Sequence, residues 1–426
     1  MYWFLTRTLA RGASLARARL LPASLRYTHP HPLTTISSCA VCSPCRSFMS
    51  LMSSMLPSTH IVVITSPARS HPSTEIVWQT LKSLRYMDGL EEAPITIVCD
   101  GCRPASSLEP GYRSRLADRL DLNPCKFSKR GIVTDAVSSN YEEYKTRLVT
   151  EAEQAGYNDL SLLQLDEHQG FAMAVKAGLE SVLDAGARYA MVVQHDRAFC
   201  RQVPRRTLTQ IFDQFRLNDQ MRYCGFPSGT SKLLAEKTEK VYKLDALLKE
   251  RTIELRPSLS LRPSIFWYDS NHIVDARKAL EIYEPYANAP SGLLERLGGI
   301  GLNRFRLRKG DFIEERFGVE QRNLLTSLRD EPAECLRYFD WFGTYLLEEV
   351  LDEETAAAEA AKGPPIFMDK RGRVTYIDHI DARGSLLPSQ RRAGAVRVPP
   401  KRRAAGDIVP TPSTLSTGGP RLSGIP

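Results

Sequence analysis

Acidic side chains stand at the ends of three apolar segments in the first half of the chain. Asp100, Asp166 and Asp196 each lie within two residues of the end of such a segment. In open α/β sheets, ligands bind outside the carboxyl ends of the strands. One acid at a strand end is commonly a turn residue. Three acids at the same edge instead predict a ligand site that uses carboxylates.

Four apolar runs and two helical segments would position these acids. The runs are continuous rather than alternating, which is typical of parallel strands that are covered on both faces. Ala172, Val175, Leu179 and Val182 recur at helical spacing. The order predicts βαβ units, and hence an α/β fold with a mostly parallel sheet and helices on both faces. The predicted strands are 60–65, 95–99, 160–165 and 189–194, and the predicted helices are 74–85 and 169–186.

The second half of the chain has a less regular pattern. Its apolar and charged residues still predict several elements, and the segment 366–383 predicts a small hairpin packed on the core. The other predicted elements are a helix over 231–251, a strand over 264–271, a helix over 274–283, a Gly-rich loop over 297–303 and a helix over 333–350.

The order of four motifs resembles the family-2 type of GT-A glycosyltransferases. The motifs are "IVVITSP", "ITIVCDGC", "DEHQGFAMAVKAGLE" and "YAMVVQHDRAF". The resemblance covers residues 59–200 well and 200–330 loosely. It implies a GT-A-like (Rossmann-like) fold and transfer of a sugar from a UDP- or GDP-sugar to a hydroxyl acceptor of unknown kind. Inversion at the anomeric carbon and dependence on Mn²⁺ or Mg²⁺ are further implications of the same resemblance.

The resemblance also assigns residues to the nucleotide-sugar site. Asp100 would bind the base and ribose, Gly170 would allow close approach of the backbone, and Lys176 would face the diphosphate. Asp196 matches the last acid of the family's metal motif, whereas Gln194 stands where the first acid would be. A carboxamide still accepts hydrogen bonds from ribose or from metal-bound water. Metal binding is therefore a weaker implication here than in the family.

The catalytic base is implied by the segment "GDFIEERFGVEQR". Glu315 aligns with the family's catalytic acid, and its neighbour Glu314 is the second candidate. Paired carboxylates help to raise one pKa, which suits a base that deprotonates a sugar hydroxyl. The alternative is a solvated charged turn. His272 is a candidate metal ligand beside Asp196, and the alternative for it is a buried strand histidine.

Two other functions are compatible with the same residues. A nucleotidyltransferase shares the strand-end acid and metal chemistry, but it usually has a Gly-rich, basic phosphate loop after the first strand. Arg69 is the one thin match for that loop. A catalytically degenerate nucleotide-binding protein is favoured by the missing first acid of the metal motif.

Charge is distributed very unevenly along the chain. The net charge is +8, but residues 1–60 contribute six Arg and no acid, and residues 363–426 contribute eleven Lys or Arg and four acids. The segment 61–362 therefore carries about five net negative charges, so bulk charge does not predict nucleic-acid binding. The sequence contains no apolar run of 18 residues, so it does not predict a transmembrane anchor. The composition is that of a soluble protein.

The two ends differ in composition from the middle. The Arg-rich, acid-free start resembles an organellar transit peptide. The alternative is that translation begins at Met49, Met52 or Met55. The expected location is a plastid or mitochondrion if the leader is real, and the cytoplasm otherwise. We divide the chain into a disordered leader (1–58), a catalytic domain (59–350) and a mostly disordered C-terminal extension (351–426).

Overall fold

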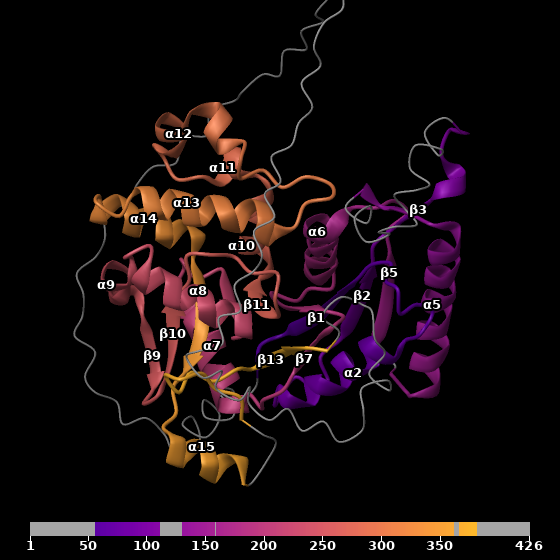
Figure 1. The fold of residues 1–426 in the computed structure, drawn as a ribbon, viewed down its shortest axis with the longest axis horizontal. Helices are drawn as coiled ribbons and strands as arrows, with labels where there is room; N and C mark the ends of the chain where they lie inside the picture. The colour runs from indigo at the N-terminus through magenta and orange to yellow at the C-terminus, as the bar shows by residue number, and fades with distance from the viewer. Residues whose placement is uncertain (1–55, 111–129, 158, 362–365, 381–426) are drawn as a thin grey trace, which may run out of the picture. The chain divides into compact units, whose positions relative to one another are not determined.

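The computed structural model describes residues 56–110, 130–157, 159–361 and 366–380 (Figure 1). Every described residue belongs to one compact unit, which lies within 53–426. The predicted leader up to residue 55 and the end of the predicted extension, 381–426, lie outside the described residues. Within the described ranges, no helix combines the length and the apolar character needed to cross a membrane.

Nine strands form one sheet in the described part of the chain, in the order β5-β2-β1-β6-β11-β8-β12-β10-β9. Two smaller pairs, β13-β7 and β3-β4, lie outside it. The strands are β1 (Thr59–Thr65), β2 (Ile95–Cys99), β3 (Arg103–Pro104), β4 (Ile132–Val133), β5 (Leu160–Gln164), β6 (Tyr189–Gln194), β7 (Arg197–Phe199), β8 (Tyr223–Gly225), β9 (Ile253–Arg256), β10 (Leu259–Pro263), β11 (His272–Asp275), β12 (Thr344–Glu349) and β13 (Ile377–His379).

Most strands of the large sheet point the same way. β5, β2, β1 and β6 pair in parallel, and so do β8 and β12. β11 runs antiparallel to β6 and β8, and β10 runs antiparallel to β12 and β9. Only β11 and β10 therefore oppose the other strands of this sheet. The predicted α/β class, with a mostly parallel sheet, is confirmed.

Helices connect and cover the strands. The α-helices are α2 (Glu75–Ser83), α5 (Asp135–Gln154), α6 (Gly170–Asp184), α7 (Arg205–Leu217), α8 (Gly229–Lys240), α9 (Asp245–Leu248), α10 (Ala276–Leu280), α11 (Pro285–Asn288), α12 (Leu293–Leu302), α13 (Val319–Ser327), α14 (Pro332–Phe342) and α15 (Glu353–Ala360). A π-helical turn, η6 (Glu314–Gly318), leads into α13. Short 3₁₀ turns are η1 (Leu84–Tyr86), η2 (Ala105–Ser107), η4 (Lys249–Arg251) and η5 (Glu281–Tyr283).

Helices α6 and α7 lie on opposite faces of the parallel half (Figure 1). Gly178 of α6 sits directly on β1, because an added Cβ would lie 2.4 Å from Val62 Cγ1. Tyr189 of β6 packs on Phe212 of α7, with ring centroids 5.1 Å apart. Val62 pairs with Val192, which is three residues from Tyr189. Since side chains alternate along a strand, Val62 and Tyr189 point to opposite faces.

Two predictions for the second half are wrong. Residues 264–271 are buried loop rather than strand, and the strand β11 begins only at His272. In this loop the Ser264 hydroxyl accepts a hydrogen bond from Phe266 N at 3.3 Å, so a side chain satisfies backbone that a strand ladder would otherwise satisfy. The predicted helix 333–350 ends at Phe342, because Gly343 takes φ +56° and the chain continues as strand β12.

Three further predictions need smaller corrections. The helix expected over 231–251 is divided into α8 and α9, with Lys243 at φ +56° between them. The helix expected over 274–283 is α10 followed by the 3₁₀ turn η5. The Gly-rich stretch expected to be a loop belongs to α12, although Gly298 breaks that helix with φ +64°. A glycine-rich segment can therefore still be helical, with one glycine interrupting the helix and helical turns on both sides of it.

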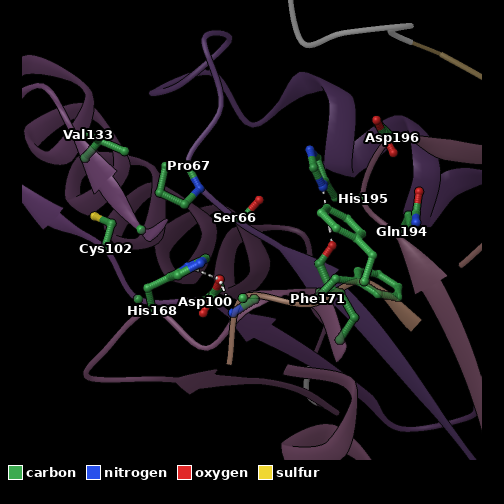
Figure 2. A pocket seen from close by; sticks show the side chains of 16 residues that line it. Ser66, Pro67, Asp100, Cys102, Val133, His168, Phe171, Gln194, His195 and Asp196 are labelled. Atoms are coloured by element: carbon green, nitrogen blue, oxygen red, sulfur yellow. Dashed lines mark hydrogen bonds and ion pairs between the residues drawn. The ribbon is translucent and has the colours of Figure 1, made fainter. Parts of the chain in front are cut away.

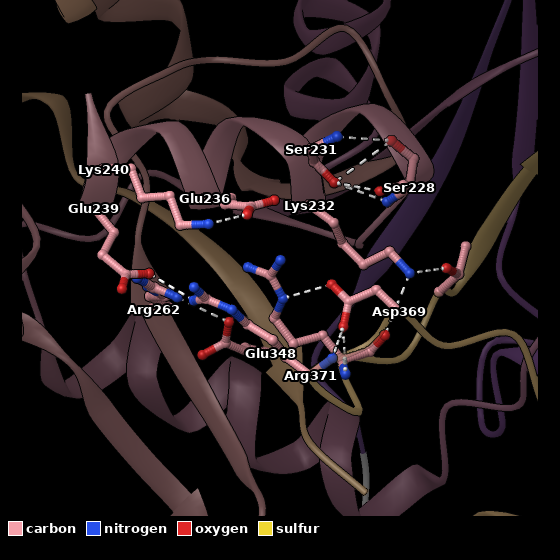
Figure 3. Close-up of polar contacts among 12 residues, drawn as sticks. Ser228, Ser231, Lys232, Glu236, Glu239, Lys240, Arg262, Glu348, Asp369 and Arg371 are labelled. Carbon is pink, nitrogen blue, oxygen red and sulfur yellow. Dashed lines mark hydrogen bonds and ion pairs between the residues drawn. The ribbon is translucent and has the colours of Figure 1, made fainter. Parts of the chain in front are cut away.

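The predicted hairpin near the C-terminus is present. Met368 bridges Val374, and β13 then pairs with β7. Figure 3 shows how α8 holds the hairpin: Lys232 donates to Arg373 O at 3.2 Å, and Arg371 donates to Glu239 at 2.6 Å. Residues 366–380, which the sequence assigns to the extension, therefore pack on the same body as the sheet.

Candidate functional site

A cavity of about 190 Å³ opens at the carboxyl ends of the parallel strands. Figure 2 shows its wall, to which the loop after β1, the loop after β2, the N-terminus of α6 and the end of β6 all contribute. This is the sheet edge at which the strand-end acids predict a ligand. Of the predicted residues, Asp100, Gly170, Gln194 and Asp196 line this cavity.

Asp100 is tied to the start of α6. Its carboxylate accepts hydrogen bonds from Gln169 N at 2.6 Å and Gly170 N at 3.1 Å, and His168 Nδ1 lies 2.8 Å away. The side chain is almost completely buried. A carboxylate at a helix N-terminus satisfies amides that have no partner within the helix and lies at the positive end of the helix dipole. Asp100 therefore positions α6 as well as lining the cavity.

Gly170 allows a close approach, as predicted, but to the chain itself. It takes φ +78°, and an added Cβ would lie 2.6 Å from Gly310 Cα. Gly310 N donates to Gln169 O at 2.7 Å, and Ala172 N donates to Asp311 O at 3.0 Å. These bonds hold the loop before Phe312, which also lines the cavity, against the start of α6.

Several predicted residues do not reach the cavity. Lys176, expected to face the diphosphate, pairs with Glu180 one helical turn along, at 3.2 Å. Asp166 and Glu167 are both exposed, and Glu167 pairs with Lys309. The acids after β5 therefore follow the predicted strand, but neither of them lines the cavity.

Gln194 and His195 are held by the surrounding backbone and side chains. Gln194 Oε1 accepts a hydrogen bond from Arg197 Nε at 2.9 Å, and Gln194 N donates to Asn271 Oδ1 at 3.2 Å. His195 Nδ1 lies 3.3 Å from Ile64 O. Since these bonds orient both side chains, the end of β6 is a rigid part of the wall.

Asp196 has a partner from the far end of the chain. His379 Nε2 lies 3.2 Å from its Oδ2, and Ile380 N donates to Asp196 O at 2.9 Å. The C-terminal hairpin therefore brings an imidazole to the acid of the metal motif. Sequence reasoning recognised the hairpin but not His379, because no spacing rule connects residues so far apart in the chain.

His272, the other predicted metal ligand, lies in the interior on β11. Its ring centroid is 4.6 Å from that of Tyr223, and Nδ1 lies 2.5 Å from Ser270 O. Burial lowers the pKa of His272 to about 4, so the ring is neutral at pH 7. Within the described ranges, no three His, Cys, Asp or Glu side chains gather to hold a metal. The position matches the buried strand histidine that the sequence left open.

A pair of carboxyl groups lies beyond Gln194. Glu314 N donates to Asp269 Oδ1 at 3.1 Å, and Asp269 N donates to Glu314 Oε2 at 3.4 Å. Asp269 is buried and Glu314 half-buried, whereas Glu315 is exposed. Of the two predicted bases, Glu314 is therefore the one whose side chain is held inside the fold.

Burial sets the protonation of this pair. Loss of solvent raises the pKa of Asp269 well above its usual range, and the charge of Glu314 raises it further. Burial also raises the pKa of Glu314, opposed by the hydrogen bond from Asp269 N and by the charge of Arg197.

Gly318 explains how Glu314 reaches Asp269. A Cβ at Gly318 would lie 2.7 Å from Trp267 O, so only glycine lets the π-helical turn pack on the segment that carries Asp269. Such turns are rare and are often found at functional sites. Sequence reasoning did not select Asp269. The only signal for Asp269 in the sequence is the polar stretch after Trp267, which falls within the segment predicted as a strand.

Comparisons with known proteins identify no family. No family model matches the chain, and no curated protein matches it significantly. Solved structures match in part: S. aureus TarS 1–349 with UDP (13% identity, TM-score 0.28, 58% of this chain and 53% of that chain) and with UDP-GlcNAc (14%, 0.22, 40% and 34%). Mannose-1-phosphate geranyltransferase from Thermus thermophilus also matches (11%, 0.20, 40% and 41%).

These likenesses are partial and weak. The chain spans about half or less of each of these structures. At such TM-scores they carry no argument about the site. The described residues by themselves define an α/β protein with a cavity at the carboxyl edge of its parallel strands.

Proposed function

We propose that the protein transfers a glycosyl group from a nucleotide-diphospho-sugar to a hydroxyl acceptor. The observation that carries the proposal is a strand-end cavity linked through Arg197 to the buried pair of Asp269 and Glu314. Gln194 and Asp196 line the cavity, and Arg197 connects Gln194 to the pair. The charge of Arg197 acts on both Asp269 and Glu314. A donor site and a candidate base therefore share one connected set of residues.

The cavity would take the base and ribose of the donor. Its volume of about 190 Å³ is below the ~300–1,000 Å³ usual for whole ligands, so the diphosphate and sugar would extend beyond it. Asp100 already accepts from Gln169 N and Gly170 N and lies beside His168. A carboxylate has about four acceptor positions, which leaves one for a ribose hydroxyl or a base N–H.

The end of β6 also suits a divalent cation. Asp196 would offer the ion a carboxylate, and His379, whose Nε2 lies 3.2 Å from that carboxylate, would offer a nitrogen. Gln194 adds a neutral oxygen, and diphosphate oxygens complete such sites elsewhere. Bound Mn²⁺ or Mg²⁺ would neutralise charge on the departing diphosphate.

Glu314 is the proposed base. It takes the proton of the acceptor hydroxyl, whose oxygen bonds to the anomeric carbon while the bond from that carbon to the diphosphate oxygen breaks. The nucleoside diphosphate leaves with the electron pair, and attack from the opposite side inverts the centre. Asp269 holds the Glu314 carboxylate through its backbone amide, and Arg197 favours the ionised form.

Binding and turnover measurements test this proposal. UDP, GDP, CTP and UDP-sugars are screened by thermal shift and calorimetry, with and without Mn²⁺. A nucleoside diphosphate or its sugar at 100 times Kd would stabilise the fold by about 2.7 kcal/mol. Release of nucleoside diphosphate from the donor supports transfer. Release of pyrophosphate from a nucleoside triphosphate would instead identify a nucleotidyltransferase, and no response to any nucleotide contradicts the proposal.

A catalytically degenerate nucleotide-binding protein is the second candidate. It is favoured because a neutral Gln194, held by Arg197, stands where the metal motif has an acid. The same screen separates the two functions. Tight nucleotide binding without any release of nucleoside diphosphate, with a broad set of acceptor hydroxyls present, would favour the degenerate protein.

A further inference from the structure

Large apolar side chains are unusually exposed on α11 and α12. The exposed fraction is 53% for Tyr286, 51% for Leu294 and 85% for Ile300, the highest of any large apolar side chain in the described ranges. Tyr286 Oη donates to Gly299 O at 2.9 Å, which holds the ring beside the Ile300 turn. These three exposed side chains of two consecutive helices are named here the apolar edge.

This edge is firmly attached through other residues. Leu293 and Leu302, at the two ends of α12, are buried. Arg296 on the same helix pairs with Glu331 at the start of α14. Gly298 breaks the helix between them, and a Cβ there would meet no atom within 4 Å. Ile300 is therefore exposed on a helix whose two ends are anchored in the core.

A basic strip directly follows the apolar edge. From Arg304 to Arg308 exposed and buried residues alternate, with Phe305 and Leu307 buried between the three arginines. The guanidinium groups of Arg304 and Arg306 have no hydrogen-bond or ion-pair partner among the described residues. Arg308, in contrast, donates to Asn303. The alternation anchors the strip by its apolar side chains and presents its cations outward.

The combination of exposed apolar and cationic groups indicates the kind of partner. Residues 285–310 hold five Lys or Arg and one acid, although 61–362 as a whole is net negative. Cations alone would suit any polyanion, but apolar side chains gain free energy only where they leave water. Surfaces that pair a basic face with bulky apolar side chains bind at the interface of anionic membranes. We propose that the edge formed by residues 285–309 docks on an anionic lipid bilayer.

The docking edge is close along the chain to the candidate site. Arg308 is two residues from Gly310, hence at most about 7 Å along the chain from the cavity wall. A bilayer bound to this edge would therefore lie near Gly310 of the cavity wall. Resting on the proposed function, this makes an acceptor hydroxyl carried on a lipid or at the membrane surface the expected substrate class.

Vesicle binding by the full chain tests the docking surface without any nucleotide. The protein is sedimented with vesicles of phosphatidylcholine, with and without phosphatidylglycerol. We expect binding only to the anionic vesicles. Because each Arg near such a surface contributes about 1 kcal/mol, Arg304→Gln with Arg306→Gln should lower the partition coefficient about 30-fold. Ile300→Asp should also weaken binding.

Matched control variants lie on α7. Leu217 is 80% exposed and Arg206 is exposed, so Leu217→Asp and Arg206→Gln change the same chemistry elsewhere and should leave binding unchanged. The basic ends of the chain are the same in all variants. If the edge and control variants lose binding equally, the proposal is wrong. Binding that ignores Ile300→Asp but is displaced by soluble polyphosphate would identify a soluble polyanion instead.

Hydrogen exchange gives a local readout in the same sample. Vesicle-bound protein should show new protection of the amides over 293–309. If the protein sediments with vesicles but these amides gain no protection, the docking edge is refuted, even if the basic ends bind lipid. Should Ile300→Asp fail to fold, Ile300→Ser replaces it. Nucleotide stabilisation measured in parallel keeps failure of the docking surface separate from failure of the proposed function.

Discussion

Asp269 and Glu314 each accept a hydrogen bond from the other's backbone amide, at 3.1 and 3.4 Å. The two residues are 45 positions apart in the chain, and the reciprocal bonds hold their carboxyl groups together where η6 begins. Asp269 accepts from the first amide of this turn, and burial raises the pKa of both carboxyl groups.

The first prediction concerns the base. Glu314→Gln removes the proton acceptor but keeps size and hydrogen bonding, so donor affinity should be retained while turnover falls about 10²- to 10⁴-fold. Glu315→Gln, on an exposed neighbour, should leave turnover nearly unchanged. Release of nucleoside diphosphate under saturating donor measures both. The reverse pattern would assign the base to Glu315, as alignment with the family implies.

The second prediction concerns stability against pH. Burial raises the pKa of both Asp269 and Glu314, so the folded state binds more protons than the unfolded state above about pH 4. Their contribution to stability is then complete below the unfolded pKa values and is lost as pH rises through the folded ones. Asp269→Asn should flatten this fall. Urea unfolding between pH 4 and about pH 8 measures it, and an equally steep fall in the variant would contradict the prediction.

The third prediction separates backbone strain from crowding. Gly170 and Gly186 have nearly the same dihedral, at φ +78° and +76°, but only Gly170 is crowded, by Gly310. Gly186→Ala should cost roughly 1–2 kcal/mol of unfolding free energy from strain alone. Gly170→Ala should cost a further ~1–3 kcal/mol from overpacking and should displace the loop at Gly310. Equal losses in the two variants would mean that the loop moves freely.

The fourth prediction concerns how much of the C-terminal segment the fold needs. Removal of 381–426 should leave a folded protein, whereas removal of 366–426 also deletes β13, the buried Tyr376 and His379. The shorter chain should lose several kcal/mol of stability, because large core side chains each contribute about 3–5 kcal/mol. Thermal unfolding of the two truncations measures this difference.

His379→Gln serves as the control for that truncation. It should keep the fold but weaken Mn²⁺-dependent nucleotide binding, as Asp196→Asn should. If both variants keep the same Mn²⁺ dependence, the cation does not bind at the end of β6, and any metal site lies elsewhere in the chain.

Much of the first half could be predicted from the sequence. Continuous apolar runs gave β2 and β6 with their observed bounds, and helical spacing gave α6. These elements depend on local pattern and burial on both faces, which single segments encode. The same reasoning predicted Asp100, Asp166 and Asp196 at one edge, because parallel strands end together. Asp100 and Asp196 line the cavity there, and Asp166 does not.

Only the tertiary structure decided what depends on distant residues. Leu346 and Leu347 fit a helical stripe, yet they belong to β12, because Gly343 ends the helix and a place between β8 and β10 is available. The contacts of Asp269 with Glu314, and of Asp196 with His379, join segments 45 and 183 residues apart. Local spacing carries no information about such pairs, whose energies arise only when the sheet and its returning hairpin have assembled.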